Sequence, residues 1–149
     1  MEKQKLKAIY GVSETYLRNT FKKAARHRGR TGEIALQMLE TRLDNLVYRM
    51  GFAPTRPGAR QLVVHGHVRV DGKKVDIPSY LVKPGQVISL VEKARNIPMV
   101  RRAQELGAPI VPYVQVDPEN FTGTLLRVPA REEIPVKVEE TLVVEFYAR

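Results

Sequence analysis

Residues 33–72 constrain the fold of this chain more than any other stretch. From Leu36 to Met50, apolar residues recur every three or four positions, which is the spacing of one apolar face of an α-helix. The pattern predicts one continuous helix over residues 33–50. Gly51 can end this helix with a positive φ, and Pro54 prevents it from continuing.

A shorter helix is predicted directly afterwards. Thr55 is a residue type that caps a first helical turn, and Pro57 is tolerated within that turn. Ala59, Leu62 and Val63 fall on one side of the helix, so we expect them to face the core.

A β-hairpin is predicted after Gly66, which breaks the second helix. Val68 and Val70 alternate with polar residues, as in a strand with one buried face. The dipeptide Asp71-Gly72 is a strong signal for a two-residue hairpin turn.

The remaining elements are predicted from weaker patterns. Further strands are expected near residues 87–91, 113–116 and 124–128, with a helix between Asn96 and Gly107. Residues 141–149 stay open, because their β-branched content favours a strand whereas the two glutamates before them suit a helix start.

Basic side chains accompany the helix–helix–hairpin pattern. Arg56 and Arg60 lie one turn apart, and like charges at this spacing destabilise an isolated helix by about 0.2–0.5 kcal/mol. An anion near the helix start would reverse this effect, because the backbone N–H groups and the helix dipole favour negative charge there. We expect both arginines to be exposed, so their removal should hardly change stability.

The overall charge points to a polyanionic partner. The 149 residues include 25 Lys and Arg against 16 Asp and Glu, a net charge of +9. Residues 1–30 carry nine of the basic residues against two acids, whereas residues 106–149 carry four against seven. A basic N-terminal part and a mildly acidic C-terminal part favour a protein that binds nucleic acid over a basic protein whose charges are only solvated.

Composition also excludes several classes of protein. The chain has no cysteine, so it has neither disulfides nor thiolate metal sites. Its apolar runs are shorter than the roughly 20 residues of a membrane helix, and no signal-peptide pattern opens the sequence. We therefore expect a soluble intracellular protein. His65-Gly66-His67 invites a metal interpretation, but the cationic neighbours argue against it, and we expect no metal and no cofactor.

Three segments resemble the RNA-binding module of the bacterial small-subunit ribosomal protein four family: RLDNLVYRMGFA (42–53), TRPGARQLVVHGHVRVDGKKV (55–75) and PSYLVKPGQVISL (78–90). The flanks LKAIYGVSETYLRNTFKKA (6–24) and LVVEFYAR (142–149) are similar too, so the resemblance covers nearly the whole chain. Members usually carry a further basic N-terminal segment, sometimes with zinc-binding cysteines, which does not precede Met1. Pro57-Gly58 also replaces more helix-favouring residues, which is expected to loosen the first turn of that helix.

The resemblance implies an α+β protein with two lobes. The helical lobe would comprise residues 1–41 joined by 133–149, with a short C-terminal helix packed on the N-terminal helices. The other lobe, 42–132, would contain the RNA-binding module 42–96 and a small, mostly antiparallel sheet packed on helices.

The implied function is that of a structural constituent of the ribosome, a primary 16S rRNA-binding protein that nucleates small-subunit assembly and contributes to translational accuracy. Its RNA partners would be a junction in the 5′ domain of 16S ribosomal RNA and its own operon mRNA. Its protein partners would be ribosomal protein five, with ribosomal protein three as a further candidate. No membrane partner is expected. Two alternatives remain open: a translational repressor that binds structured mRNA, and the RNA-binding module of an RNA-modifying enzyme. We expect no enzymatic activity, because the residues after 96 lack an acid–base constellation.

The candidate contacts fall into two sets of basic and polar side chains that would neutralise phosphates and recognise RNA by its shape. The first set is Arg49, Arg56, Arg60, Gln61, His65, His67, Arg69, Lys73 and Lys74. The second set is Arg18, Lys22, Lys23, Arg26, Arg28 and Arg30.

Overall fold

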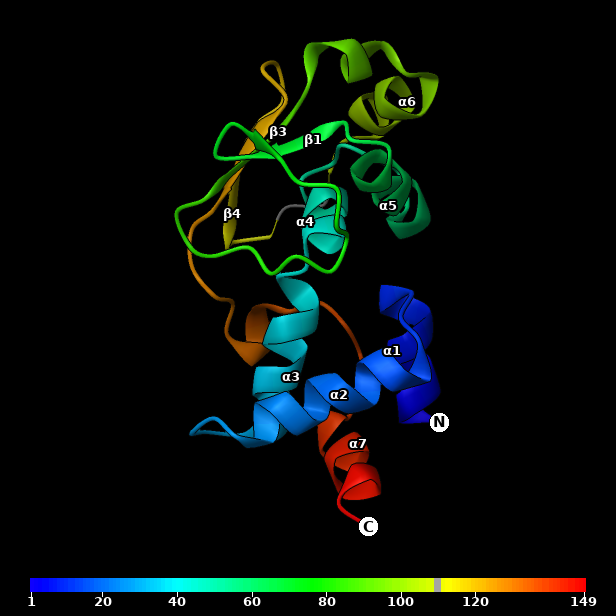
Figure 1. Ribbon diagram of the computed structural model, residues 1–149, viewed down its shortest axis with the longest axis vertical. Helices are drawn as coiled ribbons and strands as arrows, with labels where there is room; N and C mark the ends of the chain where they lie inside the picture. The colour runs from blue at the N-terminus through cyan, green and yellow to red at the C-terminus, as the bar shows by residue number, and fades with distance from the viewer. Residues whose placement is uncertain (109–110) are drawn as a thin grey trace. The chain divides into compact units, whose positions relative to one another are not determined.

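The computed structural model describes residues 1–108 and 111–149, and it divides into two compact units (Figure 1). Unit 1 comprises Met1–Glu40 and Pro129–Arg149, and unit 2 comprises Thr41–Val128. Each unit has its own cluster of buried apolar side chains. Across the described residues, no helix has the length and apolar character needed to cross a membrane.

Unit 1 is helical. Its described elements are α1 (Glu2–Tyr10), α2 (Glu14–Ala25), α3 (Thr31–Glu40), a 3₁₀ turn η2 (Arg131–Glu133) and α7 (Glu140–Tyr147). The Ser13 hydroxyl accepts a hydrogen bond from the backbone N–H of Tyr16 and so caps the start of α2.

The ambiguous C-terminal segment is a helix, as the resemblance implied. Val143 is fully enclosed, and Tyr147, four residues later on the same side of α7, packs its ring 5.5 Å from that of Phe21. Gly32 permits a close approach, because a Cβ placed there would lie 2.7 Å from the Cγ of Glu140. Packing against α2 and α3 therefore decides the helix, which local propensity leaves open.

The predicted helix over residues 33–50 is wrong in one respect, since the structure breaks it in two. α3 ends at Glu40, and α4 begins at Leu43 and runs to Arg49. Between them Arg42 is extended, with φ −60° and ψ 143°, and pairs with Leu81 in an isolated β-bridge. The N–H of Leu43 donates to the carbonyl oxygen of Tyr80 over 2.8 Å. Pairing with the 78–82 loop thus interrupts a pattern that is periodic on both sides of the break.

Unit 2 is an α+β structure, which confirms the predicted fold class. Its helices are α4 (Leu43–Arg49), α5 (Arg56–Val64), a 3₁₀ turn η1 (Glu92–Asn96) and α6 (Pro98–Leu106). Its strands are β1 (Val68–Val70), β2 (Lys73–Lys74), β3 (Val87–Leu90), β4 (Val114–Asp117) and β5 (Thr122–Leu125). They form an antiparallel sheet in the order β2-β1-β3-β5-β4.

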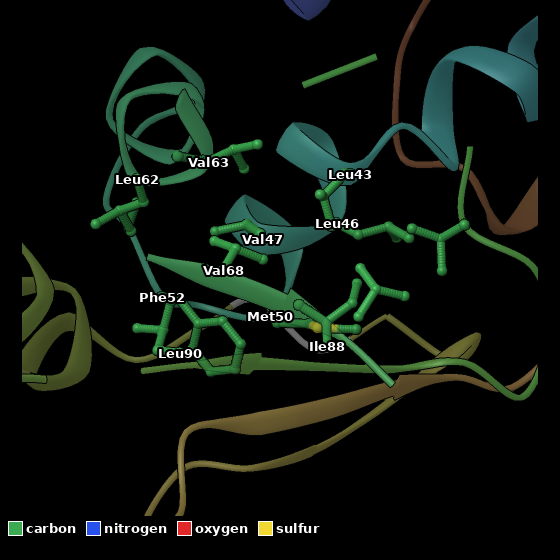
Figure 2. Close-up of a cluster of buried hydrophobic side chains, with 14 of the residues drawn as sticks. Leu43, Leu46, Val47, Met50, Phe52, Leu62, Val63, Val68, Ile88 and Leu90 are labelled. Carbon is green, nitrogen blue, oxygen red and sulfur yellow. The ribbon is translucent and has the colours of Figure 1, made fainter. Parts of the chain in front are cut away.

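The two faces of this sheet differ in chemistry. Val68, Ile88 and Leu90 point toward apolar side chains of α4 and α5, as Figure 2 shows. Gly123 on β5 belongs to the same inner face, because a Cβ there would overlap the sulfur of Met50. The inner face is therefore the core of unit 2, and the opposite, outer face carries polar side chains.

The short helix and the hairpin predicted directly after residue 50 are confirmed, whereas the strand predicted at 124–128 lies at Thr122–Leu125. The Thr55 hydroxyl accepts from the N–H of Gly58 over 3.1 Å and caps α5. Asp71 and Gly72 have φ values of 50° and 81°, as a tight hairpin turn requires. Gly58 also has a packing role that its weak helix propensity hides, because a Cβ there would lie 2.7 Å from the Met99 sulfur of α6.

Candidate nucleic-acid interface

The start of α5 fixes the position of Arg56. Its Nε donates to the Oδ1 of Asn45 over 2.8 Å, and its guanidinium carbon lies 4.6 Å from the centre of the Tyr48 ring. Asn45 is itself buried, and its backbone N–H donates to the Oδ1 of Asp44. The expectation that Arg56 is exposed is wrong, because its side chain is half-buried and contacts both Asn45 and Tyr48.

The other candidates on α4 and α5 have contrasting environments. Arg49 is only 6% exposed, and its guanidinium carbon lies 5.8 Å from the Tyr48 ring centre. Arg60 and Gln61 are exposed on α5. Arg60 is therefore the arginine of this group most open to a large polyanion.

The hairpin cations lie on two sides of the sheet. Arg69 on β1 pairs with Lys74 on β2, so these two exposed side chains leave the same, outer face. Lys73 pairs with Val70, whose side chain belongs to the core face, so Lys73 leaves the sheet on the opposite side. The structure thus groups Arg69 with Lys74 and separates both from Lys73.

The two histidines of the first set lie beside each other at the junction of α5 and β1. His65 follows the last turn of α5, and its ring lies 6.3 Å from that of His67 in an edge-on arrangement. Burial, the neighbouring His65 and the charge of Lys93 together lower the pKa of His67 below its ordinary value. The side chain of Lys74 passes within 3.3 Å of a Cβ position at Gly66, so it runs toward the same junction.

The second set belongs to unit 1. Its members are all exposed and lie on α2 and in the loop that follows it: Arg18, Lys22, Lys23, Arg26, Arg28 and Arg30. The apolar side of α2 is buried, so Arg18 and Lys22, four residues apart, share the opposite side. This set is a solvent-facing basic surface of unit 1.

The basic side chains of α1 form ion pairs with glutamates. Lys3 lies 2.8 Å and Lys7 3.4 Å from the Oε1 of Glu14, whose other oxygen accepts from the Tyr147 hydroxyl over 2.6 Å. Lys3 and Tyr147, followed by Lys7, lower the pKa of Glu14 to about 2. This cluster links α1, α2 and α7, so its charges serve the fold of unit 1.

Sequence reasoning missed three residues that shape the interface. Asn45 and Tyr48 hold Arg56, and their spacing of three on one helix was the available signal. Lys93 is exposed on η1 and close enough to His67 to lower its pKa. Only the tertiary fold brings that lysine to the α5–β1 junction.

No arrangement suited to a metal ion occurs in the described parts of the chain: residues 1–108 and 111–149 contain no group of three His, Asp or Glu side chains placed to bind one. The site consists of cationic and other N–H donors, most of them on helices and strands. Such groups bind phosphate and sugar oxygens.

Comparison with known proteins identifies the family. The chain is 53% identical over 148 residues to the small ribosomal subunit protein uS4 of Geobacillus sp. (strain WCH70), covering 99% of this chain and 74% of the relative. The chain belongs to the uS4 family. The uS4 proteins of Geobacillus stearothermophilus and Thermus thermophilus are 52% and 49% identical, over 99% of this chain and 74% and 72% of the respective relatives.

Two family models divide this uS4 chain at the same place as the structure does. The model for the ribosomal protein S4/S9 N-terminal domain matches residues 1–40, and the S4 domain matches residues 41–88. The first set of candidate contacts falls within the S4 domain, and the second set falls within the N-terminal domain. The resemblance noted from the sequence is therefore confirmed for both parts.

Proposed function

We propose that this uS4 chain is a structural constituent of the small ribosomal subunit that binds 16S ribosomal RNA and has no catalytic role. The observation that carries the proposal is the concentration of exposed basic side chains on the S4 domain. Arg60, His65, Arg69 and Lys74 lie on adjoining elements, α5 to β2, each anchored by buried neighbours.

Electrostatics supports a phosphate-rich partner. Unit 2 carries 13 Lys and Arg against seven Asp and Glu, and unit 1 carries 12 against nine. Each basic side chain that neutralises a phosphate releases a counterion, so binding should weaken steeply with salt. Rigid placement of Arg56 limits the side-chain entropy lost on binding, about 0.5–1.5 kcal/mol for a long side chain.

The finer proposal concerns the place and timing of binding. The chain would bind a multi-helix junction in the 5′ domain of 16S rRNA early in assembly and then adjoin ribosomal protein five, with protein three as a further neighbour, influencing decoding accuracy. Recognition of such a junction relies on backbone shape, which suits fixed cations better than base-reading side chains.

Footprinting tests this proposal. The full chain is bound to complete 16S rRNA at two salt concentrations, and protection of the backbone from hydroxyl radicals is mapped. Protection clustered at one junction of the 5′ domain and persisting at higher salt is expected. Diffuse protection that disappears with salt would show non-specific binding only and would contradict the proposal.

A further inference from the structure

The outer face of the sheet in unit 2 carries a row of polar side chains contributed by four neighbouring strands. The strand register pairs Lys74 with Arg69, Arg69 with Ser89, and Ser89 with Thr122. Residues paired across antiparallel strands project from the same face. We call Lys74, Arg69, Ser89 and Thr122 the outer row.

The outer row is open to solvent in unit 2. Lys74 and Arg69 are exposed, and Ser89 and Thr122 are half-buried, as expected for short side chains in a sheet. The strand neighbours of Arg69, Ser89 and Thr122 are buried on the other face, where the core helices pack. Successive strands lie about 4.8 Å apart, so the row extends roughly 14 Å from Lys74 to Thr122.

The chemistry of the row changes along its length. Two cations occupy the β2–β1 end and two hydroxyls occupy β3 and β5. On β4 the next paired residue is Asp117, whose carboxylate accepts from the Asn120 amide over 2.7 Å. A negative charge there repels phosphate, so an anionic ligand would follow the row only as far as Thr122.

We propose that the outer row is a binding surface for the ribose–phosphate backbone of RNA, with Lys74 and Arg69 neutralising phosphates and Ser89 and Thr122 donating to phosphate or ribose oxygens. The proposal rests on the proposed function, and it extends the RNA interface from the hairpin across β3 and β5.

The composition of the row favours RNA over a protein partner. The buried centre of a protein interface is apolar and rich in aromatic residues. The outer row has neither kind of side chain, although Val87, two residues before Ser89 on β3, is 38% exposed. Arg, Lys, Ser and Thr are instead the side chains that bind phosphate and sugar oxygens, and hydroxyls can also pair with the ribose 2′-OH.

The outer row lies close to the junction of α5 and β1, where His65 and His67 lie beside each other. His67 directly precedes β1 and lies two residues before Arg69, so its side chain projects toward the same face, and the Lys74 side chain runs toward Gly66. His67 is therefore displaced from Arg69 along the strand direction, and a backbone bound along the row would pass beside the histidines.

The test uses the full chain and a transcript of the 5′ domain of 16S rRNA, with affinity measured across a range of salt concentrations. The double variant Ser89→Ala, Thr122→Val should bind about three- to tenfold more weakly with an unchanged salt slope, because neutral hydroxyls displace no counterions. Arg69→Ala and Lys74→Ala should each also lower the slope by about one contact's worth. Thr141→Val, which removes an exposed hydroxyl on α7, should bind like the wild type.

Conservative variants separate contact from structure. Ser89→Thr and Thr122→Ser keep a hydroxyl at each position and should retain wild-type affinity, whether or not the double variant folds fully. Loss of affinity in these variants, or wild-type affinity in a folded double variant, would overturn the inference. Failure of the wild-type chain to bind the transcript at low salt would instead overturn the proposed function itself.

Discussion

Unit 1 and unit 2 use their basic residues differently. In unit 1, three lysines of α1 are paired with acids, and the exposed cations of the second set lie on the solvent side of α2 and in residues 26–30. In unit 2, the exposed Arg60, Arg69 and Lys74 lie on α5 and on short strands of a sheet whose other side is core. The two units carry similar numbers of basic residues. We infer that those of unit 1 attract RNA without fixing its position, whereas those of unit 2 hold phosphates at defined places.

The largest expected effect tests which unit dominates RNA binding. Arg56→Ala with Arg60→Ala should weaken binding roughly 10- to 100-fold and lower the slope of log affinity against log salt by about two contacts' worth. The matched variant is Arg26→Ala, Arg28→Ala, Arg30→Ala in unit 1. If the triple variant loses more affinity than the double variant, the fixed geometry of unit 2 is not what determines affinity.

A second prediction concerns stability, and it separates two arginines on one helix. Arg56→Ala should lower the free energy of unfolding by about 1–2 kcal/mol, because it leaves the buried Oδ1 of Asn45 without that donor. Arg60→Ala should change it by less than about 0.5 kcal/mol, since the side chain is exposed. Urea unfolding of both variants checks this, and equal losses would show that the Asn45 contact does not contribute.

A third prediction addresses the acid-paired cluster of unit 1. The pKa of Glu14 is lowered to about 2, so its contribution to stability is present above the carboxyl's ordinary pKa and is lost as the pH falls toward 2. Glu14→Gln should therefore be less stable than the wild type at pH 6, and the difference should shrink between about pH 5 and pH 2. Thermal unfolding against pH measures it, and a difference independent of pH would contradict the ionic origin.

The smallest expected effect is a pH dependence of binding in unit 2. His67 has a lowered pKa, so it is neutral at pH 7 and gains charge only under more acidic conditions. RNA affinity should rise modestly as the pH falls from 7 to 5, and His67→Gln should flatten that rise. His27→Gln in unit 1 is the matched control, and an identical effect of both substitutions would remove any special role for His67.

The predictions made from the sequence succeeded where short-range rules act. The Thr55 cap, the α5 stripe of Ala59 and Leu62, and the Asp71-Gly72 turn involve residues within four positions of each other, and all are present. The family could also be recognised from the sequence, because the resemblance depends only on the order of the residues. The candidate contacts could be listed by charge, but their accessibility could not, as Arg49 and Arg56 show.

The sequence by itself determined the amphipathic helices, the hairpin, the basic character and the family, since these depend on side-chain periodicity, turn chemistry and composition. Only the tertiary structure decided the break at Arg42, the helix at 140–147, and the sharing of one sheet face by Lys74, Arg69, Ser89 and Thr122. Each of those depends on hydrogen bonds or packing between residues distant in the chain. Such contacts can override or complete a local preference of only a few tenths of a kcal/mol per residue.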